Sequence, residues 1–336
     1  MIKVGVIGFG FMGRTHLQAW QDLQNVTVVA VCDQTFADGK PIADVVGNLD
    51  TTDPINLDGI QTFSDCDKMF SELDLDAVSI ALPTFLHCEY TLKAFEAGVH
   101  VLCEKPMGLN LDQCSQMIEA SEKAGKLLQI GQCIRFWPEY IKAKEIIDSG
   151  EYGKLLFGNF YRFSANPGWS ENSWFTDESR SGGMILDLHV HDTDFILHLL
   201  GIPKRVSSTC SNVNGVVNHV QTQYLYDNGM AVSSEGSWAI SDSFGFRMGF
   251  MIGLEKATLE FNPAICDGLQ VSPAGGKKSS AELSKGTGYS NEVTHFAKKI
   301  LGKKVPQILT PQQSMQSIKV ALAEKESAKT GKPVSL

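Results

Sequence analysis

The sequence opens with a short apolar run that leads into a glycine-rich turn. Val4 to Ile7 are followed by Gly8-Phe9-Gly10-Phe11-Met12-Gly13, and a helical pattern starts at Arg14. In a β-α-β unit, the first glycine of G-x-G-x-x-G makes a tight turn, the second admits a pyrophosphate, and the third lets the helix pack on the strand. Because the motif lies between a strand pattern and a helix pattern, it predicts a Rossmann-type domain that binds a dinucleotide.

Asp33 indicates which dinucleotide this is. It lies 20 residues after Gly13, at the end of the second expected strand. A carboxylate at this place accepts hydrogen bonds from the adenosine ribose hydroxyls and repels the 2′-phosphate of NADP, so we expect NAD as the cofactor. The alternative is that Asp33 only caps the turn that follows it.

The first 131 residues alternate strand patterns with helical patterns, which is typical of parallel strands joined by crossover helices. The expected strands are 2–8, 26–32, 77–82, 100–103 and 127–131, and the expected helices are 14–23, 86–97 and 111–124. Residues 35–59 contain two prolines and three glycines without a clear period. We expect this segment to be irregular, with at most one short helix.

The second half is dominated by strand patterns. These are 155–163, 205–208, 220–226, 231–238, 244–252 and 257–261, with helices expected at 140–148, 191–200, 291–301 and 312–329. Asp227-Asn228-Gly229 is a strong hairpin signal, because Asn-Gly readily adopts positive φ angles. The expected fold class is therefore α/β, with a Rossmann NAD-binding domain over 1–131. A C-terminal α+β domain over 132–336, with a large, open, mainly antiparallel sheet, is expected to serve substrate binding and oligomerisation.

Few helices remain to cover this second sheet, so one of its faces is expected to lie in a homo-oligomer, a dimer or a tetramer. Phe244, Phe246, Phe250 and Ile252 alternate along one strand and are expected to form part of the apolar face that is buried between subunits.

Composition excludes several classes of partner. The formal net charge is −9 and the basic residues are scattered, so nucleic acid is not expected as a partner. No apolar run is long enough to span a membrane. The eight cysteines are spaced irregularly without a C-x-x-C pair, which indicates reduced thiols in a cytoplasmic protein rather than a metal site.

Two further clusters carry ionisable groups. The strand 100–103 ends in Glu104-Lys105-Pro106, and the carboxyl ends of parallel strands line the ligand crevice, so Lys105 is expected to face the cofactor rather than to be a solvated surface charge. In the second cluster, Asp187, His191, Asp194 and His198 fall on one stripe if the segment is helical. The alternatives are that Asp187 caps the helix, that His191 is a buried and hydrogen-bonded core residue, or that His189 and His191 bind a metal.

Together, the glycine motif, Glu104-Lys105-Pro106 and the Gly-Gly-x-x-x-Asp-x-x-x-His-x-x-Asp pattern that ends at Asp194 resemble the Gfo/Idh/MocA oxidoreductase family (glucose-fructose oxidoreductase, inositol dehydrogenase and MocA), along essentially the whole chain. The resemblance implies NAD(P)-dependent redox chemistry at a carbinol carbon of a sugar, polyol or related compound. It implies Lys105, Asp187 and His191 as the catalytic residues. It further implies cofactor contacts by Pro83, Thr84, His87, Glu104 and Lys105, and substrate contacts by Arg135 and Asn166 as well as by the catalytic residues.

Oxidation of a secondary alcohol needs a base for the hydroxyl proton, and an imidazole that titrates near neutral pH suits that role. We assign it to His191, oriented by Asp187, with Lys105 stabilising negative charge on the substrate oxygen. The alternatives are a non-catalytic NAD-binding regulator, or a glycosidase or lyase that oxidises its substrate transiently with NAD. His189 departs from the family, since many members have a small residue there, and residues 35–59 lack the family's compact form.

Overall fold

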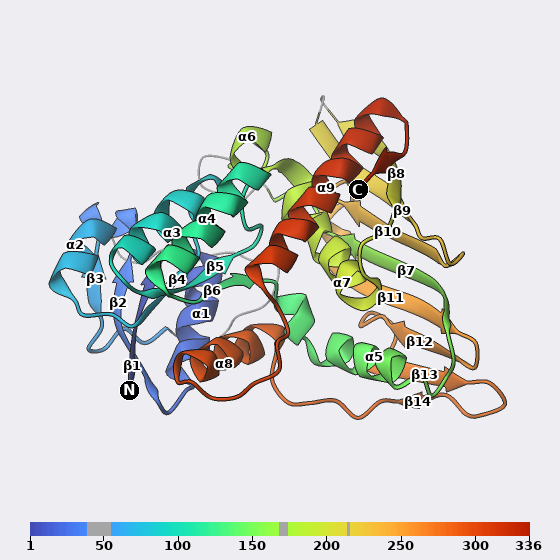
Figure 1. Ribbon diagram of the computed structural model, residues 1–336, viewed down its shortest axis with the longest axis horizontal. Helices are drawn as coiled ribbons and strands as arrows, with labels where there is room; N and C mark the ends of the chain where they lie inside the picture. The colour runs from blue at the N-terminus through green and yellow to red at the C-terminus, as the bar shows by residue number, and fades with distance from the viewer. Residues whose placement is uncertain (39–54, 168–173, 214–215) are drawn as a thin grey trace. The chain divides into compact units, whose positions relative to one another are not determined.

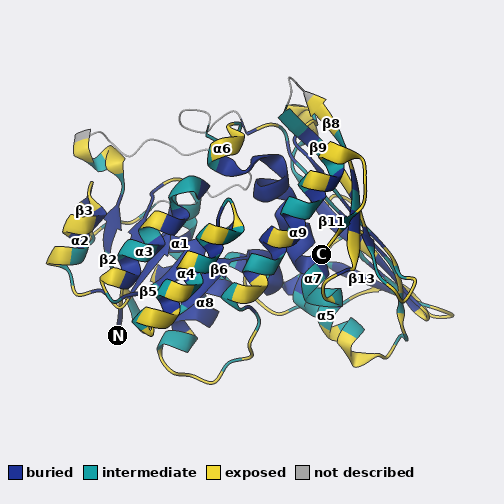
Figure 2. Ribbon diagram, turned by 45° about the horizontal axis from the view of Figure 1, so that its top comes forward, coloured by how far each residue is buried: buried dark blue, intermediate teal, exposed yellow. Residues whose placement is uncertain are grey.

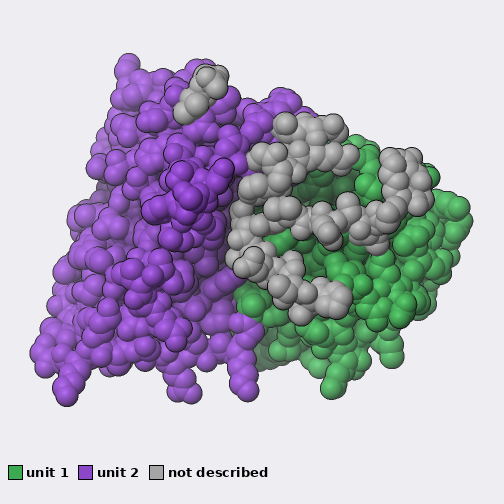
Figure 3. Space-filling model, turned by 180° about the vertical axis from the view of Figure 1, so that it is seen from behind, with its two compact units in different colours: residues 1–133, 287–315 green, residues 134–286, 316–336 purple. Residues whose placement is uncertain are grey.

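The computed structural model describes residues 1–38, 55–167, 174–213 and 216–336 (Figure 1). Residues 39–54, which make up most of the segment 35–59 that is expected to be irregular, lie outside the described residues. The chain divides into two compact units, one of residues 1–133 and 287–315 and the other of residues 134–286 and 316–336 (Figure 3). The first segment ends two residues beyond the boundary expected at 131, and residues 287–315 lie in the first unit instead of the second.

The first unit contains a six-stranded sheet in which all strands are parallel. Its strands are β1 (Ile2–Ile7), β2 (Val26–Cys32), β3 (Gln61–Phe63), β4 (Ala77–Ile80), β5 (His100–Glu104) and β6 (Leu128–Gly131), in the order β3-β2-β1-β4-β5-β6. This is the Rossmann order, and it confirms the expected parallel sheet. The strand order reverses between β1 and β4, where ligands bind in such sheets. The expected strands omit β3, which is too short to show a period.

The helices of this unit are α1 (Phe11–Gln21), α2 (Cys66–Glu72), α3 (His87–Glu96), α4 (Leu111–Ala124) and α8 (Gly288–Ile300). The last of them explains why 287–315 belongs here. Phe296 packs edge-on against Trp20 of α1, with ring centroids 6.2 Å apart, and Val293 and Phe296 are fully buried in the same apolar cluster as Val4. The amphipathic pattern of α8 predicts a buried face, but it does not tell which sheet that face meets.

The second unit contains a nine-stranded sheet. Its strands are β7 (Leu155–Phe163), β8 (Arg205–Val213), β9 (Val216–Leu225), β10 (Ala231–Ser237), β11 (Arg247–Leu254), β12 (Ala257–Phe261), β13 (Leu269–Pro273), β14 (Ser279–Ser280) and β15 (Val334–Ser335). The order is β14-β13-β12-β11-β7-β10-β9-β8-β15, and every pairing is antiparallel except that of β7 with β10. The large, mainly antiparallel sheet is thus confirmed, and the Asp227-Asn228-Gly229 turn joins β9 to β10 as expected.

Helices α5 (Pro138–Ser149), α7 (Val190–Leu200) and α9 (Pro311–Thr330) lie against one face of this sheet (Figure 1). The core beneath them is aromatic: the ring of Tyr140 lies 4.7 Å from that of Phe195 and 5.1 Å from that of Phe250. Such contacts stabilise by more than the buried area alone. Figure 2 shows the inner strands and helices as mostly buried.

One expectation about this sheet is wrong. Phe250 and Ile252 do not face a partner subunit, because they are 1% and 0% exposed and belong to the core under the helices. The pleat turns the even-numbered residues of β11 inward, so Met251 points outward and is 41% exposed. Phe244 lies before β11 in a short 3-10 helix (Asp242–Phe244), and Phe246 precedes the strand.

The eight cysteines are unpaired, and six of them are buried. Burial raises the pKa of the Cys32 and Cys114 thiols to about 12, so they stay protonated at neutral pH. This agrees with the expected reduced, mostly buried thiols. In the described part of the chain, no helix combines the length and the apolar character that crossing a bilayer requires.

Candidate active site

The glycine loop follows β1 directly, and two of its glycines are required by the turn itself. Gly8 has φ +88°, and a Cβ there would lie 2.4 Å from the carbonyl oxygen of Ala81. A Cβ on Gly13 would lie 1.9 Å from the carbonyl oxygen of Gly8. A Cβ on Gly10 would meet no described atom within 4 Å. Packing therefore does not require a glycine at position 10. The space that a side chain would fill there is open and lies in front of the loop.

That open space lies at the start of α1. Gly10 is the N-cap of α1, and Phe11 and Met12 are its first two residues. The first amides of a helix have no partner within the helix, and they carry the positive end of its dipole. A glycine N-cap has no side chain that could occupy them. The loop therefore suits the pyrophosphate of a dinucleotide.

Asp33 follows β2 and is fixed from two sides. Its Oδ2 accepts a hydrogen bond of 2.7 Å from the backbone N–H of Phe9, in the glycine loop. Its Oδ1 accepts from the backbone N–H of Thr35 at 2.9 Å and from the Thr35 hydroxyl at 2.8 Å. Asp33 therefore caps the next turn, as the alternative interpretation has it. The same contacts also hold its carboxylate beside the glycine loop, where a ribose would need it.

Pro83, Thr84 and His87 follow β4, the strand next to β1. Pro83 precedes a 3-10 helix (Thr84–Leu86) in which Thr84 is buried. The Nε2 of His87 lies 2.8 Å from the carbonyl oxygen of Leu82, and its Nδ1 lies 2.8 Å from that of Pro106. Burial lowers the pKa of His87. Because both ring nitrogens meet backbone carbonyls, His87 joins the loops after β4 and β5.

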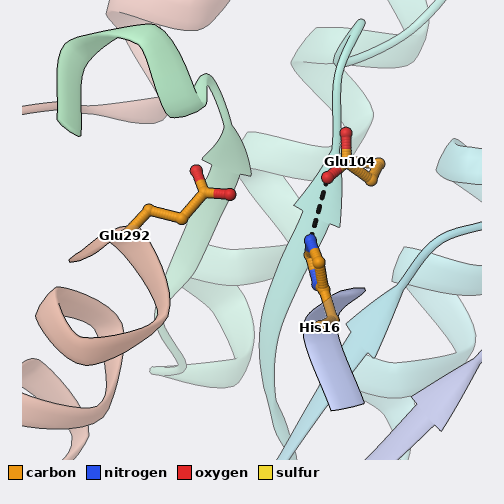
Figure 4. Close-up of side chains that lie close together, drawn as sticks. All are labelled: His16, Glu104 and Glu292. Atoms are coloured by element: carbon orange, nitrogen blue, oxygen red, sulfur yellow. Dashed lines mark hydrogen bonds and ion pairs between the residues drawn. The ribbon is translucent and has the colours of Figure 1, made fainter. Parts of the chain in front are cut away.

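Glu104 and Lys105 follow each other at the end of β5, and their side chains lie in different surroundings. Glu104 is buried; its Oε1 lies 2.9 Å from the Nε2 of His16, and its Oε2 accepts from the backbone N–H of Lys105 at 3.1 Å (Figure 4). Lys105 is partly exposed at the carboxyl edge of the sheet. The first unit therefore brings Lys105 to the same edge as the glycine loop and Asp33, while Glu104 points inward.

In the second unit, the expected helix around residue 190 has an unusual start. Residues Ile185–His189 form a π-helical turn that runs into α7 (Val190–Leu200). Asp187 lies inside this turn and is buried, and His191 is the second residue of α7 and partly exposed. Since Met184 occupies the N-cap position, Asp187 does not cap the helix. π-turns are rare and frequently occur at functional sites.

The other two residues of the expected stripe face Arg135. The Nε and Nη2 of Arg135 each donate a hydrogen bond of 2.8 Å to Asp194, and its Nη1 lies 3.3 Å from the Nδ1 of His198. Ser317 of α9 donates a hydrogen bond of 2.7 Å to Asp194. Burial and the charge of Arg135 lower the pKa of His198 to about 4, so its neutral ring can accept from Arg135. This bidentate pair orients α7.

His189 belongs to a buried polar network. Its Nε2 lies 3.1 Å from the Oε2 of Glu324 in α9 and 3.1 Å from the Oγ of Ser234 in β10. Gly236 makes room for the ring, since a Cβ there would lie 2.7 Å from the Nδ1 of His189. The network was not expected, because its members lie far apart in the sequence.

Metal binding by His189 and His191 has no support in the described ranges. The groups of close ligand atoms found there are His16, Glu104 and Glu292, and Asp65, Cys66 and Asp67. Neither group contains His189 or His191. Asn166, the remaining expected substrate contact, is exposed and follows Ala165, which pairs with Ala239 in an isolated bridge. Residues 168–173 of the same loop lie outside the described residues.

Both parts of the chain match known families. A family model described as an oxidoreductase family with an NAD-binding Rossmann fold (GFO/IDH/MocA) matches residues 2–132, and one described as the GFO/IDH/MocA C-terminal domain matches residues 140–260. A 2,7-anhydro-N-acetylneuraminate hydratase from Mediterraneibacter gnavus is 32% identical over 63% of this chain and 53% of its own length. D-glucoside 3-dehydrogenase from Escherichia coli is 29% identical over 60% of this chain and 55% of its own length.

The chain thus spans about half the length of these curated relatives. Among solved structures, levoglucosan dehydrogenase in complex with NADH and levoglucosan superposes with a TM-score of 0.82. The alignment covers 99% of both chains at 21% sequence identity, so the two proteins share the fold.

Proposed function

This chain belongs to the GFO/IDH/MocA oxidoreductase family, and we propose that it is an NAD-dependent dehydrogenase acting on a polyol, an inositol or a sugar-type substrate. The proposed reaction moves a hydride between a carbinol carbon and the nicotinamide. One observation carries the proposal: the chain combines a glycine loop fitted for a dinucleotide with the lysine, aspartate and histidine that such a reaction needs.

The residues for the cofactor fit this role. The open space at Gly10 and the first amides of α1 would hold the pyrophosphate, and Asp33 would hold the adenosine ribose. Pro83 and Thr84 follow β4 at the same edge of the sheet. When bound there, NAD supplies the hydride acceptor. His87 and Glu104 would act on the cofactor site through the loops that they fix.

The proton chemistry is assigned to three side chains. His191 would accept the hydroxyl proton as hydride leaves carbon, and Asp187 would orient the imidazole and stabilise its charged form. Lys105 would stabilise the negative charge that develops on the substrate oxygen. Asn166 is exposed and can contact a substrate directly. Because its guanidinium is already held by Asp194, Arg135 would act mainly by positioning α7.

Turnover with a panel of polyols, inositols and sugars, followed at the NADH absorbance, tests the proposal. We expect NADH formation with at least one of them. NAD binding without turnover of any substrate would favour a regulator. Product formation without added NAD and without NADH accumulation would favour transient oxidation by a retained cofactor. The panel includes this readout because one relative is named a hydratase.

Cofactor binding is assigned to the domain that begins at residue 1 and ends near 131, and substrate binding and oligomerisation to the domain that follows. For the latter we propose a homo-oligomer formed through the outer face of the nine-stranded sheet. Phe157, Tyr161 and Phe163 alternate toward that face along β7 and are only half-buried, and Met251 of β11 lies among them. We expect Met251→Lys to lower the mass measured by light scattering. A monomeric parent protein at micromolar concentration contradicts the proposal.

We also place the enzyme in the cytoplasm. All eight of its cysteines are unpaired, as thiols are in a reducing compartment.

A further inference from the structure

Three buried ionisable side chains meet in the first unit. They are His16 of α1, Glu104 of β5 and Glu292 of α8, and each is at most 6% exposed (Figure 4). One ligand atom of each lies within 4.8 Å of those of the other two. The Nε2 of His16 lies 2.9 Å from the Oε1 of Glu104, so these two are already hydrogen-bonded. Glu292 is the third member, and its carboxyl group points toward the pair.

Glu292 is unusual because its carboxyl group is buried without a partner. It has no exposed surface, and neither of its oxygens has a hydrogen-bond partner among the described residues. An ionised carboxylate in such a place is among the least favourable states of a protein interior. Burial and the nearby charge of Glu104 raise the pKa of Glu292 well above its usual range. In contrast, His16 and Lys105 lower the pKa of Glu104 despite its burial.

The titratable and charged groups around Glu292 and Glu104 come from several elements. His16 lies on α1, Glu104 ends β5, and Lys105 follows it. His87 of α3 acts on Glu104 as well. On its own helix, His295 is held by Gln129 and by the carbonyl oxygen of Pro306.

A metal ion fits this set less well than a proton does. His16 and Glu104 direct the atoms that would bind a metal at each other, 2.9 Å apart, and a metal would have to break that hydrogen bond. Structural zinc sites have four ligands, and the described group offers three. A proton fits without breaking the bond between His16 and Glu104, because a carboxylic acid can donate to the nearby carboxylate through one water molecule, or directly after a small movement of the Glu292 side chain.

We propose that Glu292 is a neutral carboxylic acid at neutral pH, that its proton is directed at Glu104, and that it thereby positions Glu104 and the Lys105 backbone that Glu104 binds. The two carboxyl groups then carry one negative charge between them. His16 and the N–H of Lys105 both donate to that charge. Glu292 is thus a positioning residue for the end of β5. The effect of Glu292 on turnover rests on the proposed function, whereas the proposed protonation state of Glu292 does not depend on it.

The direct test is infrared spectroscopy of the parent protein and Glu292→Gln at pH 7. A glutamine has the shape and the neutrality of the protonated acid, so the variant should fold. We expect the parent to show the C=O stretch of a protonated carboxyl group that is missing from Glu292→Gln. The matched control is Glu119→Gln, an exposed position on α4, which should leave this band unchanged. A parent spectrum without a band assignable to Glu292 overturns the proposal.

The pH dependence of stability gives a second readout. The unfolded chain ionises Glu292 near its ordinary pKa of 4.5, whereas the folded protein keeps the proton to higher pH. The contribution of Glu292 to stability is therefore complete below the unfolded-state pKa, and it is lost as the pH rises toward the folded-state pKa. We expect the Tm of Glu292→Gln, relative to the parent, to rise by at least about 2 °C between pH 5 and pH 8. A constant difference at both pH values contradicts the proposal.

Two further measurements separate the outcomes. If the parent binds one equivalent of metal and Glu292→Gln does not, a cation rather than a proton occupies this cluster, and the proposal is overturned. If the enzyme turns over, we expect Glu292→Gln to keep kcat at pH 7 within about threefold of the parent, because the variant mimics the protonated state. A loss of more than a hundredfold would mean that the ionised carboxylate is required. If no substrate turns over, the infrared and Tm results still decide the protonation state.

Discussion

The Nε2 of His189 lies 3.1 Å from the Oε2 of Glu324, and neither side chain has any exposed surface. His189 ends the π-turn that contains Asp187, while Glu324 comes from α9, more than 130 residues later. The Thr193 hydroxyl lies 3.1 Å and 3.3 Å from the two oxygens of Glu324. The pair therefore fixes the π-turn, and with it Asp187 and His191, against α9.

From this relationship we expect Glu324→Ala to lower the free energy of unfolding by about 1–3 kcal/mol, because it removes a buried hydrogen-bond partner of both His189 and Thr193. Urea unfolding measures the change. Glu326→Ala is the matched control, since Glu326 is exposed two residues further along the same helix and should change stability by no more than about 0.5 kcal/mol. Equal effects of the two substitutions would mean that the contact between Glu324 and His189 does not hold the turn.

The glycine loop gives a paired prediction. We expect Gly13→Ala to disrupt the fold of the first unit, because its Cβ would lie 1.9 Å from the Gly8 carbonyl oxygen. Gly10→Ala meets no described atom, so its stability should stay within about 1 kcal/mol of the parent. It should nevertheless weaken NAD binding at least tenfold, because the methyl group enters the space assigned to the pyrophosphate. Thermal unfolding and fluorescence titration with NAD check both effects. Unchanged NAD affinity in Gly10→Ala would place the pyrophosphate elsewhere.

Asp33 gives a prediction about cofactor choice. We expect the parent to prefer NAD, and Asp33→Ser to shift the ratio of kcat/KM for NAD over NADP by about tenfold or more toward NADP, since it removes both the ribose acceptor and the charge that repels a 2′-phosphate. Asp112→Ser, on the exposed first turn of α4, serves as the control. A parent enzyme that uses NADP equally well contradicts this role of Asp33.

Local signals in the sequence predicted local structure well. The run from β1 through Gly8 to α1 and the Asp227-Asn228-Gly229 turn each depend on neighbouring residues, and both are present as expected. The whole parallel sheet except β3 follows from the alternation of patterns. The catalytic candidates Asp187 and His191 could be found because they share one helical segment.

Long-range pairing could not be predicted in the same way. Arg135 and Asp194 are 59 residues apart, and no pattern in either segment indicates that they form a bidentate pair. Likewise, Glu292 looks like a polar residue of an amphipathic helix until α8 is placed on the first sheet. The π-turn also has no sequence signal, since it differs from an α-turn only in the backbone register.

The catalytic assignment predicts that Lys105→Met and His191→Ala each reduce kcat by about 10²–10⁴-fold, because one removes the charge that stabilises the substrate oxygen and the other removes the base. NAD affinity should stay within a few-fold of the parent, since the dinucleotide is assigned to the glycine loop and Asp33. The two groups serve one proton transfer, so the double variant should be little slower than either single variant.

Fluorescence titration with NAD and NADH formation on an identified substrate separate binding from turnover. Lys123→Met is a suitable control for Lys105→Met, because Lys123 is exposed in the last turn of α4, before β6 begins, whereas Lys105 lies at the carboxyl end of β5. If either catalytic variant keeps near-parental kcat, its residue is misassigned. If both lose NAD binding while remaining folded, Lys105 and His191 serve the cofactor instead, and a regulator becomes the better account of this chain.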